Sequence, residues 1–451
     1  MKRSLVLVLG LAIAALAGCK TQQAPFIDAF PDNVNKPLPP DEFGLFKLDP
    51  KDYPDMRSAF VDRAGLERAI DKSIQYMNAG SSRRFFPSGP KDPITHDQVL
   101  ATLLDFKKMI NTQGMTPDQF QAAILARYEV WASKGYNWDT RPADQPGEVW
   151  FTGYYTPIYQ GSRTRTSEFA YPIYSRPGDL VSDPITGDVQ GQKMPDGSVR
   201  PYPTRRELTA ANGALLKRLG AQELLWFRDP MEPYIIQVQG SAKVNLTDGQ
   251  TVLVGYAGKN GRDYKGLGSQ LLALGELDAK HLSLPAVLEY FKAHPEKREE
   301  FINNNDSFAF LKFYEPAEWP SGSLGVQVTP TRSLATDKKI FPRAAITFVT
   351  VDMATAAGGT SASRRFLCDQ DTGGAIRAAG RGDIYMGIGE EAGQLAGRQF
   401  AQGHLFYLVL KPTLVTSSAF PALTPATRTS ATRPVAPKTG TKTGSDEMFP
   451  K

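Results

Sequence analysis

The sequence predicts a mainly β fold with flanking helices, and three observations favour it. From about residue 147, segments rich in β-branched and aromatic residues alternate with turn signals, as in GEVWFTGYYTP and IFPRAAITFVTVDM. The helical patterns gather in two blocks, one before residue 147 and one within 268–305, instead of alternating with strands. Thr247-Asp248-Gly249-Gln250 is typical of a hairpin tip. Together they favour a β-barrel, although pattern alone leaves open which barrel.

The first eighteen residues have the pattern of an export signal. MKR supplies a basic start and SLVLVLGLAIAA an apolar run that is short for a spanning helix. Leu16-Ala17-Gly18-Cys19 resembles the bacterial lipobox, in which the cysteine is acylated and becomes the mature N-terminus. Each buried methylene of such acyl chains contributes about 0.8 kcal/mol to anchoring. Lys20 after the cysteine, by the same resemblance, indicates an outer-membrane lipoprotein facing the periplasm.

Composition excludes several classes of function. The 451-residue chain has a formal net charge of +5, which falls to +3 once Lys2 and Arg3 leave with the signal. That charge is small and no dense basic run exists, so nucleic acid is not an expected partner. Cys368 is the only cysteine besides Cys19, so no intrachain disulfide is expected after acylation. The four histidines lie far apart without metal-ligand spacing, and we expect no metal and no cofactor.

Changes in composition along the chain suggest domain boundaries. The expected segments are a signal peptide at 1–18, a Pro- and Asp-rich tether at 19–55, helices with the first part of the barrel at 56–157, an inserted β domain at 158–285, the rest of the barrel at 286–412 and a disordered tail at 413–451.

Three helices are predicted ahead of the strands. The first carries an apolar face over residues 66–77, and the next two begin at capping boxes led by Thr95 and Thr116. The third is expected to run on through Trp131 to a glycine stop at Gly135. These helices are interpreted as packing elements.

Acidic residues are the leading candidates for proton transfer, because the chain has no GxSxG, no P-loop and no dinucleotide fingerprint. Asp371 precedes Thr372-Gly373-Gly374, which is typical of a turn residue. Asp383 instead leads the apolar run Ile384-Tyr385-Met386, where desolvation would raise its pKa. A raised carboxyl pKa is what a general acid near neutral pH requires.

Several motifs together resemble the membrane-bound lytic murein transglycosylase A family. They span roughly residues 150 to 412, in the order of that family. The motifs are FTGYYTP (151–157), YPIYSRP (171–177), YPTRREL (202–208), QVQGSAKVNLTDGQTVLVGYAGKNG (237–261), LATDKKIFPRA (334–344) and DTGGAIRAAGRGDIYMGIG (371–389).

The resemblance implies a double-psi β-barrel, with a smaller β domain inserted into it and a groove between the two. It also implies a C-terminal subdomain named for three aspartates, which match Asp337, Asp371 and Asp383 here. Asp383 matches the catalytic acid of the family, and Asp371 and Asp337 would support it. The chain departs from the pattern at 342–344, where Pro-Arg-Ala replaces the expected Pro-Leu-Gly and puts the local turn in question.

The implied activity is lytic cleavage of the β-1,4 bond between N-acetylmuramic acid and N-acetylglucosamine in peptidoglycan. This is a carbon–oxygen lyase reaction that leaves a 1,6-anhydromuramoyl end. Asp383 would protonate the glycosidic oxygen and then, as carboxylate, take the proton of the muramoyl C6 hydroxyl. Whether cleavage occurs within strands or from their ends is left open.

Substrate contacts are expected from hydroxyl, amide and aromatic groups. The candidates are Tyr154, Tyr155, Thr156, Gln237, Gln239, Ser241 and Lys243. If residues 237–241 form a strand, Gln237, Gln239 and Ser241 share one face. Alternation puts only one of the two tyrosines toward a groove, and the sequence does not say which. The pair at 205–206, both arginine, is a weaker candidate for a substrate carboxylate, against a surface or ion-pair role.

Two other hypotheses about the function remain. The first is a glycan hydrolase on the same barrel, with Asp371 or Asp337 as the base that activates water. The second is a non-catalytic lipoprotein that binds murein, which the three aspartates argue against. The expected partners are peptidoglycan glycan strands and outer-membrane lipid through acylated Cys19, and proteins of cell-wall synthesis or division stay an open class.

Overall fold

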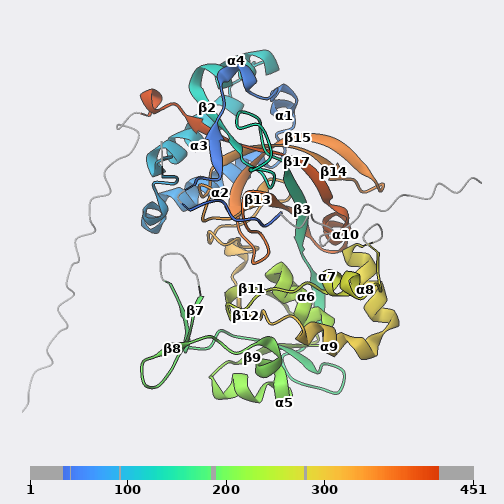
Figure 1. Ribbon diagram of the computed structural model, residues 1–451. Helices are drawn as coiled ribbons and strands as arrows, with labels where there is room; N and C mark the ends of the chain where they lie inside the picture. The colour runs from blue at the N-terminus through green and yellow to red at the C-terminus, as the bar shows by residue number, and fades with distance from the viewer. Residues whose placement is uncertain (1–33, 41, 91–92, 184–188, 279–281, 416–451) are drawn as a thin grey trace, which may run out of the picture. The chain divides into compact units, whose positions relative to one another are not determined.

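The computed structural model describes residues 34–40, 42–90, 93–183, 189–278 and 282–415 (Figure 1). The predicted signal, Cys19 and the tail beyond residue 415 lie outside these ranges. The tether predicted over 19–55 is wrong for its last part, because Leu45–Lys47 forms strand β1 and pairs with strand β2, Tyr128–Ser133. Phe43, Leu45 and Leu48 are buried there, an apolar set too short to stand out beside prolines and aspartates.

Six strands of the main sheet close into a barrel, in the order β17-β14-β15-β13-β16-β3 and back to β17. Their bounds are β3 Val149–Thr156, β13 Ser333–Ala335, β14 Ile346–Ala354, β15 Thr360–Asp371, β16 Arg381–Ile388 and β17 Phe400–Leu410. The pairs β13–β15 and β16–β3 are parallel, and the other barrel pairs are antiparallel. The expected mainly β fold built on a barrel is confirmed.

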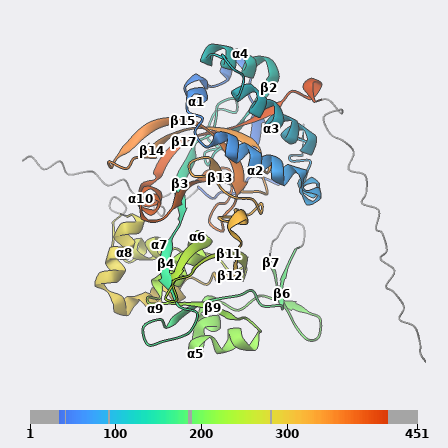
Figure 2. The same ribbon diagram turned by 180° about the vertical axis from the view of Figure 1, so that it is seen from behind.

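Four helices pack against the barrel strands, and both views show them gathered around β2 and β15 (Figures 1 and 2). They are α1 Arg57–Val61, α2 Leu66–Asn78, α3 His96–Ile110 and α4 Pro117–Arg127. Phe366 of β15 lies 5.0 Å from Phe106 of α3 and 5.7 Å from Phe120 of α4, ring centre to ring centre. The capping boxes predicted at Thr95 and Thr116 are both present.

Helix α4, which matches the third predicted helix, ends earlier than the sequence predicted. It stops at Arg127, and Tyr128–Ser133 forms strand β2, which pairs with β1 and with the end of β17. Aromatic and β-branched residues favour a strand, and pairing on both edges outweighs the helical spacing of Tyr128 and Trp131.

Residues between β3 and β13 contribute no described strand to the barrel. Instead they form a four-stranded sheet, β12-β11-β10-β4, and two smaller sheets, β5-β9 and β6-β7-β8. The strands are β4 Ile158–Gly161, β5 Tyr171–Tyr174, β6 Leu180–Ser182, β7 Val189–Lys193, β8 Val199–Arg200, β9 Glu223–Phe227, β10 Ser241–Leu246, β11 Thr251–Lys259 and β12 Ala309–Phe313. The helices are α5 Arg205–Arg218, α6 Met231–Gln239, α7 Leu267–Ala273, α8 Leu284–Ala293 and α9 Arg298–Asn303, and α10 Glu390–Arg398 lies later in the chain.

Two details of this region differ from expectation. Strand β12 pairs with β11 and so belongs to the four-stranded sheet, although the sequence placed 286–412 in the barrel. The segment SLGVQVTP (323–330) has the alternation of a strand, but its Gln327 forms only an isolated bridge with Ser321, just ahead of it. Strand patterns do not reveal their pairing partners, which explains the first difference. The hairpin expected at 247–250 is confirmed, with Gly249 at φ +85° between β10 and β11.

Helix α6 replaces part of a predicted strand. Gln237 and Gln239 lie on this helix, which ends at Gly240 with φ +81°, and only Ser241 begins a strand. The run Tyr-Ile-Ile-Gln-Val has strand propensity, but its tyrosine and isoleucines pack into buried clusters as a helix. Gln237, Gln239 and Ser241 therefore do not share one face of a strand.

Across the described ranges, every helix is too short or too polar to cross a membrane.

Candidate active site

Strand register brings two of the three predicted aspartates onto one row. Ala335 of β13 pairs with Asp371 on one side and with Asp383 on the other, and Asp383 pairs in turn with Thr152 of β3. Adjacent strands lie about 4.8 Å apart, so the two aspartate Cα atoms are separated by about 10 Å. The row crosses the barrel wall from β15 to β3.

Asp383 is held by one hydrogen bond in a mostly buried position. Its Oδ1 accepts the Thr152 hydroxyl at 2.9 Å. Burial raises the pKa of Asp383 to about 6, the positive charge of Arg381 works against this rise, and the nearby Asp371 carboxyl adds to it. A carboxyl with this pKa retains a proton at mildly acidic pH and releases it near neutrality, as a group that donates and then accepts a proton must.

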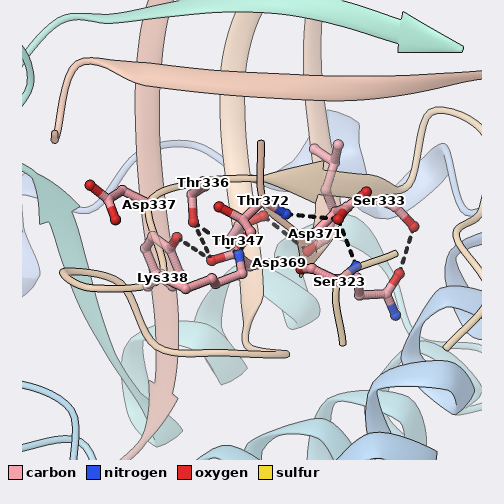
Figure 3. Close-up of polar contacts among 12 residues, drawn as sticks. Ser323, Ser333, Thr336, Asp337, Lys338, Thr347, Asp369, Asp371 and Thr372 are labelled. Carbon is pink, nitrogen blue, oxygen red and sulfur yellow. Dashed lines mark hydrogen bonds and ion pairs between the residues drawn. The ribbon is translucent and has the colours of Figure 1, made fainter. Parts of the chain in front are cut away.

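Asp371 ends β15, and both of its carboxylate oxygens accept hydrogen bonds. Its Oδ1 accepts the backbone N–H groups of Ser323 at 2.7 Å and Thr372 at 2.8 Å (Figure 3). Its Oδ2 accepts the Tyr154 hydroxyl at 2.9 Å. Burial raises the pKa of Asp371, and these three hydrogen bonds oppose the rise. Burial and the Asp371 charge raise the pKa of Tyr154, so that hydroxyl stays a donor.

Asp337 lies apart from the row and fixes the loop that joins the other two acids. Its carboxylate accepts the backbone N–H groups of Lys339 and Ala378, each at 3.0 Å. Ala378 belongs to the loop between Asp371 and Asp383 and has a φ of +62°. Asp337 is therefore placed to hold backbone.

The turn at 342–344 forms despite the unexpected residues. Ala344 adopts φ +63°, a left-handed conformation that favours glycine, and its N–H donates to the Asp369 carbonyl at 2.8 Å. The departure from the expected Pro-Leu-Gly thus leaves an alanine in a strained position without removing the turn.

The sequence reasoning missed a buried ion pair beside the row. Asp369 has no exposed surface, and its carboxylate pairs with the Lys338 ammonium (Figure 3). Its Oδ2 also accepts the hydroxyls of Thr336 at 2.7 Å and Tyr407 at 2.8 Å. Burial raises the pKa of Asp369 and lowers that of Lys338, and the attraction between the two charges opposes both shifts. The available signal was an acid inside the apolar run Phe-Leu-Cys-Asp, since charges in such runs are paired.

Comparison with known proteins supplies the family. Residues 150–312 match the model of the MltA specific insert domain, and residues 332–409 match that of the 3D domain. Membrane-bound lytic murein transglycosylase A of Escherichia coli K12 is 32% identical over 281 residues, which cover 61% of this chain and 69% of that protein. The chain belongs to the membrane-bound lytic murein transglycosylase A family. The relative of the same name in Vibrio cholerae is 31% identical over 293 residues, covering 64% of this chain and 72% of that protein.

Solved structures of MltA-family proteins show the same fold. A membrane-bound lytic murein transglycosylase from Agrobacterium tumefaciens superposes with a TM-score of 0.65 at 24% identity, covering 82% of this chain and 98% of that one. E. coli MltA with bound chitohexaose gives a TM-score of 0.57 at 25% identity, covering 85% of this chain and all of that one.

The tyrosine pair of this MltA-family chain divides as alternation requires. Tyr154 reaches Asp371 with its hydroxyl, and its ring lies 5.1 Å from the ring of Tyr385. Tyr155 is 8% exposed, and its backbone N–H donates to Gln239 Oε1 at 3.0 Å. Tyr154 is thus the member that reaches the acids.

The other predicted substrate contacts are mostly used within the protein. Thr156 and Ser241 are buried and share a hydrogen bond of 3.0 Å, and Thr156 also bonds the Tyr385 hydroxyl. Lys243 lies on β10, partly buried. Gln237 is 9% exposed, and its Oε1 has no hydrogen-bond partner in the described part of the chain.

Both arginines of the predicted pair form hydrogen bonds within the protein. Arg205 is buried and its guanidinium donates to the carbonyls of Asn305 and Ser307. Arg206 donates to the Asn304 side chain at 3.0 Å. Within the described residues, no group of three or more His, Cys, Asp or Glu side chains is placed to hold a metal ion.

We expect Lys338→Met to destabilise the protein by about 3–5 kcal/mol, because it leaves the Asp369 carboxylate buried without a counter-charge. The double variant Lys338→Met/Asp369→Asn has no buried charge at this place. The amide oxygen at position 369 can still accept the hydroxyls of Thr336 and Tyr407, so the double variant should recover most of the lost stability. Urea unfolding of both variants measures the difference, with the exposed Lys108→Met as control. A double variant no more stable than the single one would contradict the ion-pair account.

We also expect Asp383→Asn to stabilise the fold at neutral pH. The pKa of Asp383 is raised in the folded state to about 6 from 3.8, so its ionisation costs stability as pH rises through that window. The full cost, about 3 kcal/mol, is present above pH 6 and absent below about pH 4. The stability gain of Asp383→Asn over the parent, measured by urea unfolding, should therefore appear at pH 8 and vanish at pH 4. The exposed Asp352→Asn is the matched control, and a gain that does not vary with pH would count against a raised pKa.

Proposed function

We propose that this member of the lytic murein transglycosylase A family cleaves peptidoglycan glycan strands with Asp383 as its acid. The supporting observation is a carboxyl with a pKa of about 6, which strand β13 separates from a second, partly buried acid on the row Asp371-Ala335-Asp383-Thr152. The enzyme class follows from the family, whose members are named lytic murein transglycosylases.

Cleavage begins with a proton on Asp383. The acid donates it to the oxygen of the β-1,4 bond between N-acetylmuramic acid and N-acetylglucosamine, and the bond from that oxygen to the muramoyl C1 breaks. The leaving glucosamine end departs as an alcohol, and an oxocarbenium-like centre forms at C1. Because desolvation raises the pKa of Asp383 to about 6, the carboxyl still carries this proton at mildly acidic pH.

The same carboxylate completes the reaction. Asp383, now ionised, accepts the proton of the muramoyl C6 hydroxyl while that oxygen bonds to C1. The products are a 1,6-anhydromuramoyl end and a regenerated acid. No water is consumed, and one carboxyl serves both steps.

Asp371 supports Asp383 and is poorly suited to activate water. One of its oxygens already accepts two backbone N–H groups and the other accepts the Tyr154 hydroxyl. A hydrolytic base would have to act through the one lone pair that Oδ2 keeps beside the Tyr154 hydrogen bond. These contacts favour a transglycosylase over a hydrolase, with the Asp371 charge helping to keep Asp383 protonated.

We further propose that the closed barrel is of the double-psi type, and that residues 158–313 form the inserted domain with the glycan lying in a groove between the two. The hydrogen bonds Thr156–Ser241 and Tyr155–Gln239 join β3 of the barrel to β10 and α6 beyond it. E. coli MltA has been solved with bound chitohexaose, which supports a glycan ligand for this fold. Tyr154, Gln237 and Lys243 remain the proposed substrate contacts.

The proposed location is the outer membrane, facing the periplasm through acylated Cys19. The relatives are named membrane-bound, and the lipobox pattern of residues 16–19 supports a lipid anchor.

The test digests purified murein with the full chain and with Asp383→Asn, and resolves the products by mass spectrometry. We expect anhydromuropeptides, one water lighter than hydrolytic products, and a loss of at least about 100-fold in rate for the variant. Asp352→Asn should retain parent activity. Products with free reducing ends would indicate a hydrolase, and binding of murein without cleavage by the parent would indicate a non-catalytic tether.

A further inference from the structure

A hollow of about 440 Å³ lies where the segment after β5 meets β11 and β12. Its lining, which we call the Tyr256 hollow, consists of Ser175, Arg176, Tyr256, Ala257, Leu311 and Lys312. None of these residues belongs to the row of acids or to the predicted substrate contacts. A hollow of this volume can hold a small ligand.

Two cations of the hollow lack a counter-charge. Arg176 and Lys312 are exposed, and neither forms an ion pair with a carboxylate within the described ranges. Arg176 is nonetheless held in place, because its guanidinium donates to the Leu180 carbonyl at 2.8 Å and to the Ser182 hydroxyl at 3.1 Å. The Lys312 ammonium lies 4.6 Å from the centre of the Tyr314 ring and has no carboxylate partner among the described residues. A fixed guanidinium and an ammonium paired only with an aromatic ring are both suited to carboxylate groups.

An exposed aromatic ring lies near Arg176, whose positive charge acts on the Tyr256 hydroxyl. Tyr256 is 44% exposed, an unusual fraction for a tyrosine on a strand paired on both edges. Its carbonyl accepts the Tyr314 hydroxyl at 3.2 Å, and the β11–β12 register shifts between Tyr256 and Gly258. Bulges of this kind redirect a side chain, and here the Tyr256 ring presents an apolar surface near the Arg176 guanidinium.

Strand β11 links the hollow to the loop that joins the two acids. Lys259, at its end, places Nζ 3.5 Å from where a Cβ on Gly374 would lie, and Gly374 belongs to the loop between Asp371 and Asp383. Tyr256 precedes Lys259 by three residues, about 10 Å along a strand. The hollow is therefore within reach of a substituent carried by a chain that is cleaved at Asp383.

We propose that the Tyr256 hollow binds the acidic peptide stem that muramic acid carries in peptidoglycan. This proposal rests on the proposed function. The stem offers carboxylates for Arg176 and Lys312 and an apolar backbone for the Tyr256 ring. Because the stem is covalently attached to the glycan, even weak contacts gain from the high local concentration that glycan binding creates. The hollow thus makes the enzyme prefer strands that carry peptides over bare strands.

The test compares two substrates and two charge-neutralising double variants. The substrates are soluble peptide-bearing glycan strands and the same strands after an amidase has removed their peptides. The variants are Arg176→Gln/Lys312→Gln and the matched control Arg68→Gln/Lys108→Gln, which neutralises two exposed cations on α2 and α3. The Arg176→Gln/Lys312→Gln variant should have a KM for peptide-bearing strands that is roughly tenfold higher than that of the parent. Its kcat, and its KM for bare strands, should match those of the parent.

Three results would overturn the proposal: an equal rise in KM on both substrates, no rise on either, or the same rise in the control variant. Calorimetry with the free disaccharide-peptide, in the Asp383→Asn background, provides a second measurement that needs no cleavage. It should show binding that the Arg176→Gln/Lys312→Gln changes weaken about tenfold. If the parent cleaves neither substrate, the proposed function fails, and calorimetry then decides on the hollow separately.

Discussion

The three-residue strand β13 is the constraint on which the site depends. It lies between β15, to which it runs parallel, and β16, to which it runs antiparallel, so that Ala335 separates Asp371 from Asp383. A slip of one residue would turn a strand's side chains to the other face of the barrel wall and would separate the acids. A strand this short cannot fix its own register.

Buried polar contacts hold β13 in register from both ends. Ahead of it, the buried Arg332 donates to the Phe366 carbonyl at 3.0 Å and pairs with Asp62 at 2.6 Å. Within it, the Ser333 hydroxyl donates to Gln370 at 2.5 Å. After it, the Thr336 hydroxyl donates to Asp369. Each contact would leave a buried group unpaired if the strand slipped, which costs about 1–3 kcal/mol per group.

The same burial that sets the register sets the chemistry. Desolvation raises the pKa of Asp369, Asp371 and Asp383, but the three acids are compensated differently. Lys338 neutralises Asp369 and three hydrogen bonds engage Asp371, whereas Asp383 receives one hydroxyl and the attraction of the Arg381 charge. The least compensated acid is the one free to exchange its proton, and the fold accepts its cost in stability.

Sequence reasoning found the parts of this arrangement that depend on local patterns. The strand that carries Tyr154, the acid leading the apolar run at 383 and the capping boxes all follow from short-range spacing. Tyr128 in β2 and Gln237 in α6 were misassigned, because tertiary pairing and packing outweighed propensity. The ion pair at Asp369 was missed, since its partner lies 31 positions away in sequence.

The central claim is that Asp383 holds a proton because the barrel buries it, and a carboxyl titration tests it most directly. The chain, labelled with ¹³C at aspartate side-chain carbons, is followed by NMR from pH 3 to 8, and Asp383→Asn identifies the signal. The account predicts a midpoint near pH 6 that falls in Asp371→Asn, because Asp371 contributes to the rise. A midpoint near the ordinary aspartate value of 3.8 would contradict it.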